Sequence, residues 1–519
     1  MKYFLLSICS FHQPTFLSTI MTKKTIEDLG KQDNWSSPFT GRYCSNEAKI
    51  LAGETFRWGS IRKVWIAALR AQIKLGVFEG LPSDKVPTTK AIKKLEDNLY
   101  SFDWEKIRSI EKGNKHDVMA HISYITDHMV PELGQTIHLG MTSEDANANG
   151  DIIQQNEWIR NILGLSGYFI RIGFDRIRQY KGLAMLGETH LQPAAAVTFG
   201  KRIAMWIGPI IENFIALHNL LETRTLKGVR GATGTYEALL KLFDNDSKKI
   251  KEFEKLLIQE LGIDITKLVP GQTAPRDWDV QLLHCFSSLG NNLAKIATDF
   301  RHMARVGEIS EPRKEDQVCS SAMPWKYNPM ISERLNSLAR LLSGYKITAD
   351  MTCQVQGLER TLDDSAGRRV YMSESFLDLD ACFLLAIELF QGLNVFENVI
   401  SLRLNKMLPF LATEEILSIA VKHGLPRQDT HHFIMQKCKE VWSDLSNGVI
   451  SENDLLERLK NDPNSPLKNI TIPSRIDAKN YIGLSEDLCY DFVEHFIQKV
   501  DPILSKIGKN TVIVEKSEV

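Results

Sequence analysis

The sequence lacks a strong excess of charge of either sign, and it lacks paired cysteines. Its 63 lysines and arginines nearly balance 64 aspartates and glutamates, so the basic stripe typical of a nucleic-acid-binding protein is missing. The eight cysteines are scattered, without a Cys-x-x-Cys pair, which fits reduced thiols better than disulfides or a zinc site. We therefore expect a cytoplasmic protein that binds no nucleic acid.

Long hydrophobic runs and cofactor motifs are missing as well. Beyond residue 20 we find no stretch of the ~18–20 apolar residues that a membrane span needs. The chain has no His-Glu-x-x-His, no Gly-x-Gly-x-x-Gly after a strand and no Gly-Lys-Ser/Thr phosphate loop. These absences predict no membrane association, no metal and no cofactor. Residues 1–20 are predicted to be a disordered extension, because Met21-Thr22-Lys23-Lys24 makes a normal cytosolic start.

Helical periodicity is the dominant pattern that is present. Apolar residues recur at three- and four-residue steps through 152–169, 203–221 and 282–303, which predicts long amphipathic helices. Little alternating sequence lies between them, and polar, Gly- or Pro-containing segments such as 187–200 are expected to be connections. The pattern predicts an all-α protein with a central bundle of long helices. We expect an N-terminal helical domain at 21–142, a central bundle at 143–395 and a C-terminal helical domain at 396–519.

One constrained loop combines groups that could do chemistry. Residues 320–329 read Ser-Ser-Ala-Met-Pro-Trp-Lys-Tyr-Asn-Pro, so two hydroxyls, a cation and an amide lie close together. The decapeptide resembles the signature of the fumarase/aspartase superfamily, Ser-Ser-x-Met-Pro-x-Lys-x-Asn-Pro, at every fixed position. Because residues 311–329 are charged and lack a helical apolar face, we also expect this segment to be a mobile lid.

Further segments resemble one branch of that superfamily, the adenylosuccinate lyases. They read Gly-Arg-Tyr at 41–43, Lys-His-Asp at 115–117, Thr-Ser at 142–143, Gly-Glu-Thr-His-Leu-Gln-Pro at 187–193, Gly-Gln-Thr at 271–273 and Glu-Arg-Thr-Leu-Asp-Asp-Ser-Ala-Gly-Arg-Arg at 359–369. The resemblance covers nearly the whole chain from residue 36. It implies a homotetramer whose central helices form a twenty-helix core, with each active site built from three subunits.

The implied reaction is the elimination of fumarate from adenylosuccinate to give AMP, and from SAICAR to give AICAR. Such a reaction needs a base for the proton beside the carboxylate, an acid for the departing nitrogen and donors around the developing charge. The resemblance implies that Ser320 is the base and His190 the acid. On the sequence alone Ser321 remains a rival base. Nothing in this chemistry requires a metal or an organic cofactor.

The substrate carries a phosphate and two carboxylates, so cations and polar groups must bind it. Arginine suits this task because its planar fork donates two parallel hydrogen bonds. The resemblance implies the following substrate-binding residues: Arg42, Tyr43, Lys115, His116, Asp117, Thr142, Ser143, Thr189, Gln272, Lys326, Asn328, Arg334, Arg360, Ser365 and Arg369.

Two alternatives remain at this point. One is another lyase of the superfamily that acts on argininosuccinate or malate, and the other is a homologue that has kept the bundle and lost the activity. We further expect His190 and Ser320 to come from different chains, because a long helix near 279–305 would separate the loops around it by tens of ångströms within one chain.

Overall fold

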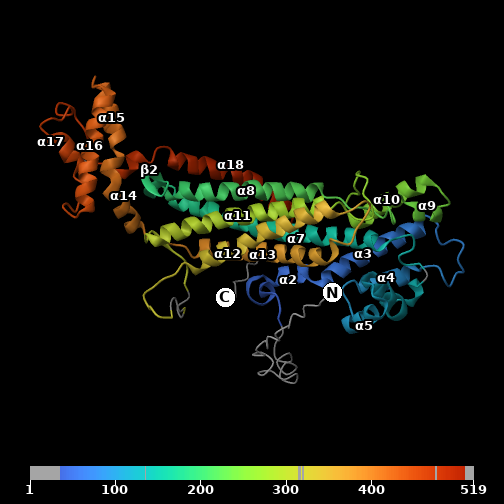
Figure 1. Cartoon of the computed structure of the whole chain (residues 1–519). Helices are drawn as coiled ribbons and strands as arrows, with labels where there is room; N and C mark the ends of the chain where they lie inside the picture. The colour runs from blue at the N-terminus through green and yellow to red at the C-terminus, as the bar shows by residue number, and fades with distance from the viewer. Residues whose placement is uncertain (1–34, 135, 314–316, 318–320, 474–475, 509–519) are drawn as a thin grey trace, which may run out of the picture.

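The computed structural model describes residues 35–134, 136–313, 317, 321–473 and 476–508. Most of these residues are helical, and the longest helices run side by side along one axis (Figure 1). The predicted extension, residues 1–20, lies outside the described residues. The elements before the bundle are η1 (Phe39–Tyr43), α2 (Asn46–Ala52), α3 (Glu54–Lys74), α4 (Thr89–Asp97), α5 (Trp104–Asn114), α6 (Asp117–Tyr124), η2 (Ile125–Met129) and η3 (Pro131–Leu133).

The bundle is built on α7 (Ser143–Tyr180), α8 (Phe199–Thr223), α11 (Asp277–Arg305), α12 (Met330–Val355) and α13 (Ser365–Gln391). Their periodic apolar residues meet in one core, in which Phe169, Trp206, Phe300 and Phe390 are almost fully buried. Two short helices, α9 (Glu237–Leu242) and α10 (Ser247–Leu261), interrupt the bundle between α8 and α11. The helical periodicity therefore predicted the long helices correctly.

The prediction of an all-α fold needs one correction, because the part of the chain that the structure describes contains two small sheets. Strands β1 (Ala184–Thr189) and β2 (Gln192–Thr198) form an antiparallel hairpin within a segment expected to be a connection. Strands β3 (Ile309–Ser310) and β4 (Asn394–Val395) pair over two residues only. Elements this short carry too little alternation to be recognised in a sequence.

The C-terminal part starts with a group of helices at one end of the bundle (Figure 1). These are α14 (Glu397–Leu411), α15 (Thr413–Lys422), α16 (Arg427–Ser446) and α17 (Leu455–Asn461), followed by η4 (Ala478–Tyr481) and α18 (Ser485–Lys506). The last helix returns to the bundle, where Val493 and Leu504 belong to the main core. α18 thus packs on the bundle core, and the three domain boundaries stay predictions.

Beyond residue 20 the sequence indicated no stretch apolar enough for a membrane span, but helix α8 is long and apolar enough by composition to cross a membrane. Its side chains Trp206, Ile207, Ile210 and Phe214 are nevertheless buried against the rest of the bundle. A core helix passes the same compositional test, and the packing of α8 is typical of one.

Candidate active site

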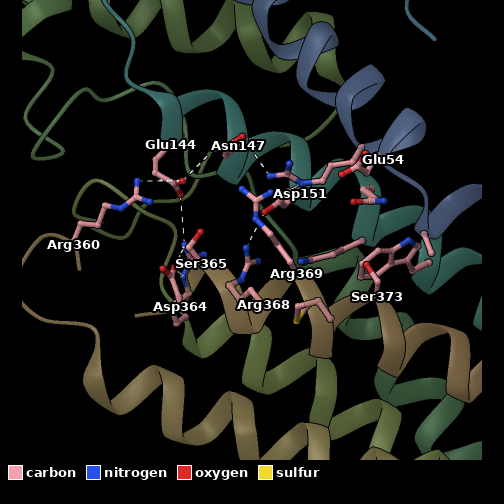
Figure 2. Close-up of a pocket in the computed structure, with 17 residues that line it drawn as sticks. Glu54, Glu144, Asn147, Asp151, Arg360, Asp364, Ser365, Arg368, Arg369 and Ser373 are labelled. Carbon is pink, nitrogen blue, oxygen red and sulfur yellow. Dashed lines mark hydrogen bonds and ion pairs between the residues drawn. The ribbon is translucent and has the colours of Figure 1, made fainter. Parts of the chain in front are cut away.

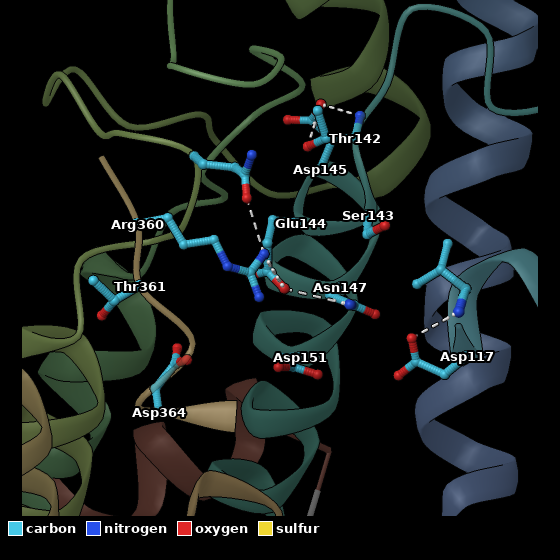
Figure 3. Close-up of polar contacts among 12 residues, drawn as sticks. Asp117, Thr142, Ser143, Glu144, Asp145, Asn147, Asp151, Arg360, Thr361 and Asp364 are labelled. Carbon is cyan, nitrogen blue, oxygen red and sulfur yellow. Dashed lines mark hydrogen bonds and ion pairs between the residues drawn. The ribbon is translucent and has the colours of Figure 1, made fainter. Parts of the chain in front are cut away.

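Several of the predicted substrate-binding residues lie around the first turn of α7 (Figure 3). Thr142 caps this helix, and the Asp145 side chain accepts a hydrogen bond from the Thr142 backbone N–H at 2.9 Å. This reciprocal capping box fixes where α7 begins. Ser143 is the first residue of the helix, and its Oγ lies 3.3 Å from Nε2 of His116.

His116 and its neighbours lie at the N-terminus of a second helix, α6. His116 caps α6 through Nδ1, which accepts from the Met119 N–H at 3.4 Å. Asp117 forms an ion pair with Arg369 at 2.7 Å. Lys115, the residue before His116, has a positive φ of 57°. Burial alone would raise the pKa of Asp117, but the hydrogen bonds from Arg369 and the Val118 N–H, together with the charges of Arg369 and Arg57, lower it.

Arg360 joins this cluster from the loop before α13. Its guanidinium donates to Oε1 of Gln272 at 3.0 Å and lies 3.2 Å from Oε1 of Glu144. Gln272 in turn donates through Nε2 to the carbonyl of Ala232 at 3.1 Å. Arg360, Ser365 and Arg369 all line one cavity of about 170 Å³ (Figure 2). Seven of the predicted residues are therefore joined by the contacts or the cavity described here: Asp117, Ser143, His116, Gln272, Arg360, Ser365 and Arg369.

Arg57, Asp151 and Arg368 line the cavity and belong to a network of arginines and carboxylates that the sequence analysis did not single out. Arg368 binds Asp279 at 2.7 Å and Asp151 at 2.9 Å, and Arg57 also binds Asp151 at 2.8 Å. Burial would raise the pKa of Asp151, but Arg57 and Arg368 lower it to about 2. Asp151 is thus charged at neutral pH, and its ion pairs hold Arg57 and Arg368 beside the cavity.

Two further members connect the network to the capping turn. Arg276 binds Asp364 at 2.5 Å and lies 3.5 Å from Glu144. Glu144, Asn147 and Asp151 follow one face of α7 at steps of three and four residues, and all three line the cavity. That spacing, together with the Thr-x-x-Asp pattern at 142–145, was a readable signal for a polar helix face at this site.

His190 lies at the tip of the β1–β2 hairpin and is exposed. Both central residues of its turn have positive φ, 54° for His190 and 59° for Leu191. Tight hairpin turns require this conformation, but glycine or asparagine normally adopts it. Two non-glycine residues held there indicate local strain of the kind found at functional sites. Thr189 precedes His190 at the end of β1.

An ion-pair cluster supports the hairpin close to its tip. Arg403 of α14 binds Glu188, two residues before His190, at 2.9 Å, and it also binds the buried Glu308. Burial raises the pKa of Glu308, although Arg403 and Arg202 oppose that effect. The cluster ties the hairpin to the segment that follows α11.

The predicted base, Ser320, lies outside the described residues, as does part of the predicted lid. Of the same loop, Ser321 and Lys326 are exposed and Asn328 is half-buried. Arg334 lies in the first turns of α12, and its Cζ atom is 5.9 Å from the centre of the Tyr43 ring. Arg42, in η1, is exposed beside Tyr43.

The described part of one chain does not bring His190 to the substrate-binding cluster. Ser143 begins α7 and His190 follows its end, and the 38 residues of this helix make it roughly 57 Å long at ~1.5 Å per residue. Figure 1 shows the hairpin strand β2 beside α14 at one end of the bundle, with α3 and α4 towards the other end. The predicted acid and the predicted substrate-binding cluster therefore lie towards opposite ends of the bundle.

The described residues do not support the expected separation across α11, and Ser320 itself lies outside them. α8 runs away from the hairpin and α11 runs back, so the end of α11 returns to the hairpin. Arg403 accordingly contacts both Glu188 and Glu308. The large separation within one chain is instead between His190 and the start of α7.

Among the residues that the structure describes, no group of three or more His, Cys, Asp or Glu side chains is arranged to hold a metal ion. The geometry offers arginine-lined binding of an anionic ligand at one end of the bundle and an exposed imidazole at the other.

Comparison with protein-family models gives two matches. Residues 37–344 match a family described as lyase, and residues 409–492 match the adenylosuccinate lyase C-terminus. The first match includes the capping turn, the hairpin and the serine loop. It leaves out Arg360, Ser365 and Arg369.

Individual relatives extend the similarity over the whole chain. Adenylosuccinate lyase from Schizosaccharomyces pombe is 34% identical over 499 residues, which is 94% of this chain and 99% of the relative. The enzymes from Schistosoma mansoni and Saccharomyces cerevisiae are 34% and 33% identical, over 91% and 90% of this chain and 96% and 95% of their own lengths.

Solved structures match in fold. A fumarate lyase from Mesorhizobium has a TM-score of 0.73 at 18% identity, covering 89% of this chain and all of that chain. A 3-carboxy-cis,cis-muconate lactonizing enzyme from Pseudomonas putida has a TM-score of 0.75 at 19% identity, covering 90% and 100%. These two establish the long-helix fold and nothing about the substrate.

Proposed function

Because this chain belongs to the adenylosuccinate lyase family, we propose that it eliminates fumarate from adenylosuccinate to give AMP, and from SAICAR to give AICAR. The observation that carries the proposal is the full-length similarity to adenylosuccinate lyases, combined with arginines around one cavity. Each substrate has one phosphate and two carboxylates, and Arg360 and Arg369 offer planar cations that suit such anions.

We assign the proton transfers to two residues. Ser320 removes the proton from the carbon beside the substrate carboxylate, and His190 protonates the nitrogen that leaves. Lys326 and backbone N–H groups of the serine loop lower the pKa of the serine, because a cation or donor stabilises its alkoxide. The exposed position of His190 on a strained turn supports its role, since a proton donor must reach the substrate.

The remaining predicted residues bind and orient the substrate. Thr142, Ser143 and His116 present hydroxyl and imidazole groups at the positive end of α7, where an anion is favoured. Gln272, Arg360, Ser365 and Arg369 complete this side. The η1 segment, the serine loop, the first turns of α12 and the end of β1 contribute Arg42, Tyr43, Lys326, Asn328, Arg334 and Thr189. Lys115 and Asp117 hold the turn at His116.

We further propose that the protein is a cytoplasmic homotetramer with a twenty-helix core and active sites shared between three subunits. The ~57 Å length of α7 supports shared sites, because His190 and Ser143 of one chain are too far apart to contact one substrate. Exposed apolar side chains on the bundle helices support the assembly, since patches of this kind mark interfaces. They are Met205 on α8 and Leu341, Ile347, Met351 and Val355 on α12.

A spectrophotometric assay tests the proposed reaction. Purified protein incubated with adenylosuccinate should change the purine absorbance and release fumarate and AMP in equal amounts. Argininosuccinate and malate serve as controls and should not be consumed. Fumarate release from either control, with none from adenylosuccinate, would contradict the proposal.

A further inference from the structure

Lys227 and Asp145 form an ion pair in the interior beside the substrate-binding cluster. Both side chains are fully buried, and Nζ of Lys227 lies 2.6 Å from Oδ1 of Asp145. A buried pair of charges is poor evidence for stability, because desolvation cancels much of the attraction and an apolar pair often packs as well. The other hydrogen bonds of the carboxylate and the ammonium therefore have to explain why this pair is buried here.

The Asp145 carboxylate collects backbone N–H groups from two separate segments. It accepts from Thr142 at 2.9 Å, from Arg230 at 2.9 Å and from Gly231 at 3.1 Å. Thr142 belongs to the capping turn of α7, whereas Arg230 and Gly231 belong to the loop after α8. One carboxylate thus fixes this loop against the start of α7.

Lys227 adds a third segment. Its ammonium also donates to the backbone carbonyl of Gln272 at 2.9 Å. The backbone N–H of Gln272 donates to the carbonyl of Glu359 at 3.0 Å, and its side chain accepts from Arg360 at 3.0 Å. Through Gln272, the ammonium is connected to the arginine that we place against the substrate.

A neighbouring amide reinforces the same arrangement. Asn149, one turn along α7 from Asp145, donates to the carbonyl of Gly228 at 3.1 Å and accepts from its N–H at 3.0 Å. Gly228 has a φ of 85°, which a glycine adopts without strain. The backbone directly after Lys227 is therefore held beside α7.

We propose that Lys227 and Asp145 are a positioning pair that sets the geometry of Thr142, Ser143, Gln272 and Arg360 for substrate binding. This inference rests on the proposed function. Neither member of the pair reaches the surface, so neither touches the substrate. Because the groups that they position bind the substrate and transfer no proton, loss of the pair affects KM rather than kcat.

The test uses a double substitution, because Lys227→Met alone leaves an uncompensated buried carboxylate and costs stability. Lys227→Met combined with Asp145→Asn removes both charges at nearly constant volume. The double variant should still fold, though with a lower unfolding temperature because the asparagine amide keeps only one accepting oxygen, and it should raise KM for adenylosuccinate at least ~10-fold and keep kcat within about threefold. Lys437→Met is the matched control: it breaks the ion pairs of Lys437 with Glu440 and Asp462 on the distant α16 side, and KM should not change.

A second comparison separates positioning from a general loss of structure. In a Gln272→Ala background the contact between Gln272 and Arg360 is already lost, so the double substitution should raise KM much less than it does in the wild type. Equal effects in both backgrounds, or an unchanged KM in the folded double variant, would overturn the inference. Wild-type protein that releases no fumarate contradicts the proposed function instead, so the two failures are distinguishable.

Discussion

At the scale of single residues, His190 and Ser320 carry the proposed proton transfers. His190→Gln and Ser320→Ala should each lower kcat by ~10²–10⁴-fold while the fold is kept, because each removes one proton-transfer group. Circular dichroism checks the fold and fumarate release gives kcat. Ser321→Ala is the matched control and should retain most of the turnover. Near-normal turnover in Ser320→Ala with loss in Ser321→Ala would identify the other serine as the base.

Asp378 gives a second prediction at this scale. It is fully buried in α13, its Oδ2 has no hydrogen-bond partner among the described residues, and burial raises its pKa from 3.8 to about 8. Between those two values the folded protein keeps a proton that the unfolded chain releases. The free energy of unfolding should therefore fall as pH rises from about 4 to 8.

Asp378→Asn removes the titration, so its stability relative to wild type should increase over the same pH window. Chemical unfolding at several pH values measures the difference. The exposed substitution Asp175→Asn serves as the control and should leave the wild-type profile unchanged. A constant difference between Asp378→Asn and wild type from pH 4 to 8 would show that Asp378 does not titrate there.

At the scale of elements, the hairpin combines exposure with strain. Leu191→Gly should raise the free energy of unfolding by about 1 kcal/mol, because glycine adopts a positive φ without the penalty that leucine meets. Leu191 is 59% exposed, so little apolar packing is lost. We expect kcat to fall, because a looser turn holds His190 less firmly.

Leu191→Ala shortens the same side chain but keeps the backbone penalty. It should therefore show no gain in the free energy of unfolding, as measured by thermal or chemical denaturation. A glycine variant no more stable than the alanine variant would show that the turn stores no strain.

The sequence predicted the long helices because their apolar residues repeat over many turns. It missed the β1–β2 hairpin, whose strands are short and which contains Pro193 and small residues with weak alternation. It also missed the network of Arg57, Asp151 and Arg368, since these residues are distant in sequence and only the fold brings them together. Residues in local motifs, such as His116 and Asp117, could be proposed from the sequence because their context is contiguous.

At the scale of the whole molecule, the long bundle divides the proposed site. Arg360 and Arg369 lie with the start of α7, and His190 lies beyond its far end. Each helix of such a bundle has two ends, so an assembly that places neighbouring chains in opposite directions brings one chain's hairpin to another chain's arginines. This requirement gives the proposed tetramer a function as well as a stabilising role.

Subunit mixing tests this division most directly. One parent carries His190→Gln and the other carries Arg360→Met with Arg369→Met, and each should be nearly inactive alone. After dissociation and reassembly together, random mixing should give both intact contributions to roughly a quarter of the sites in a symmetric tetramer. Recovery of about that fraction of wild-type fumarate release is the predicted result, whereas verified mixed tetramers that stay inactive would contradict the shared site.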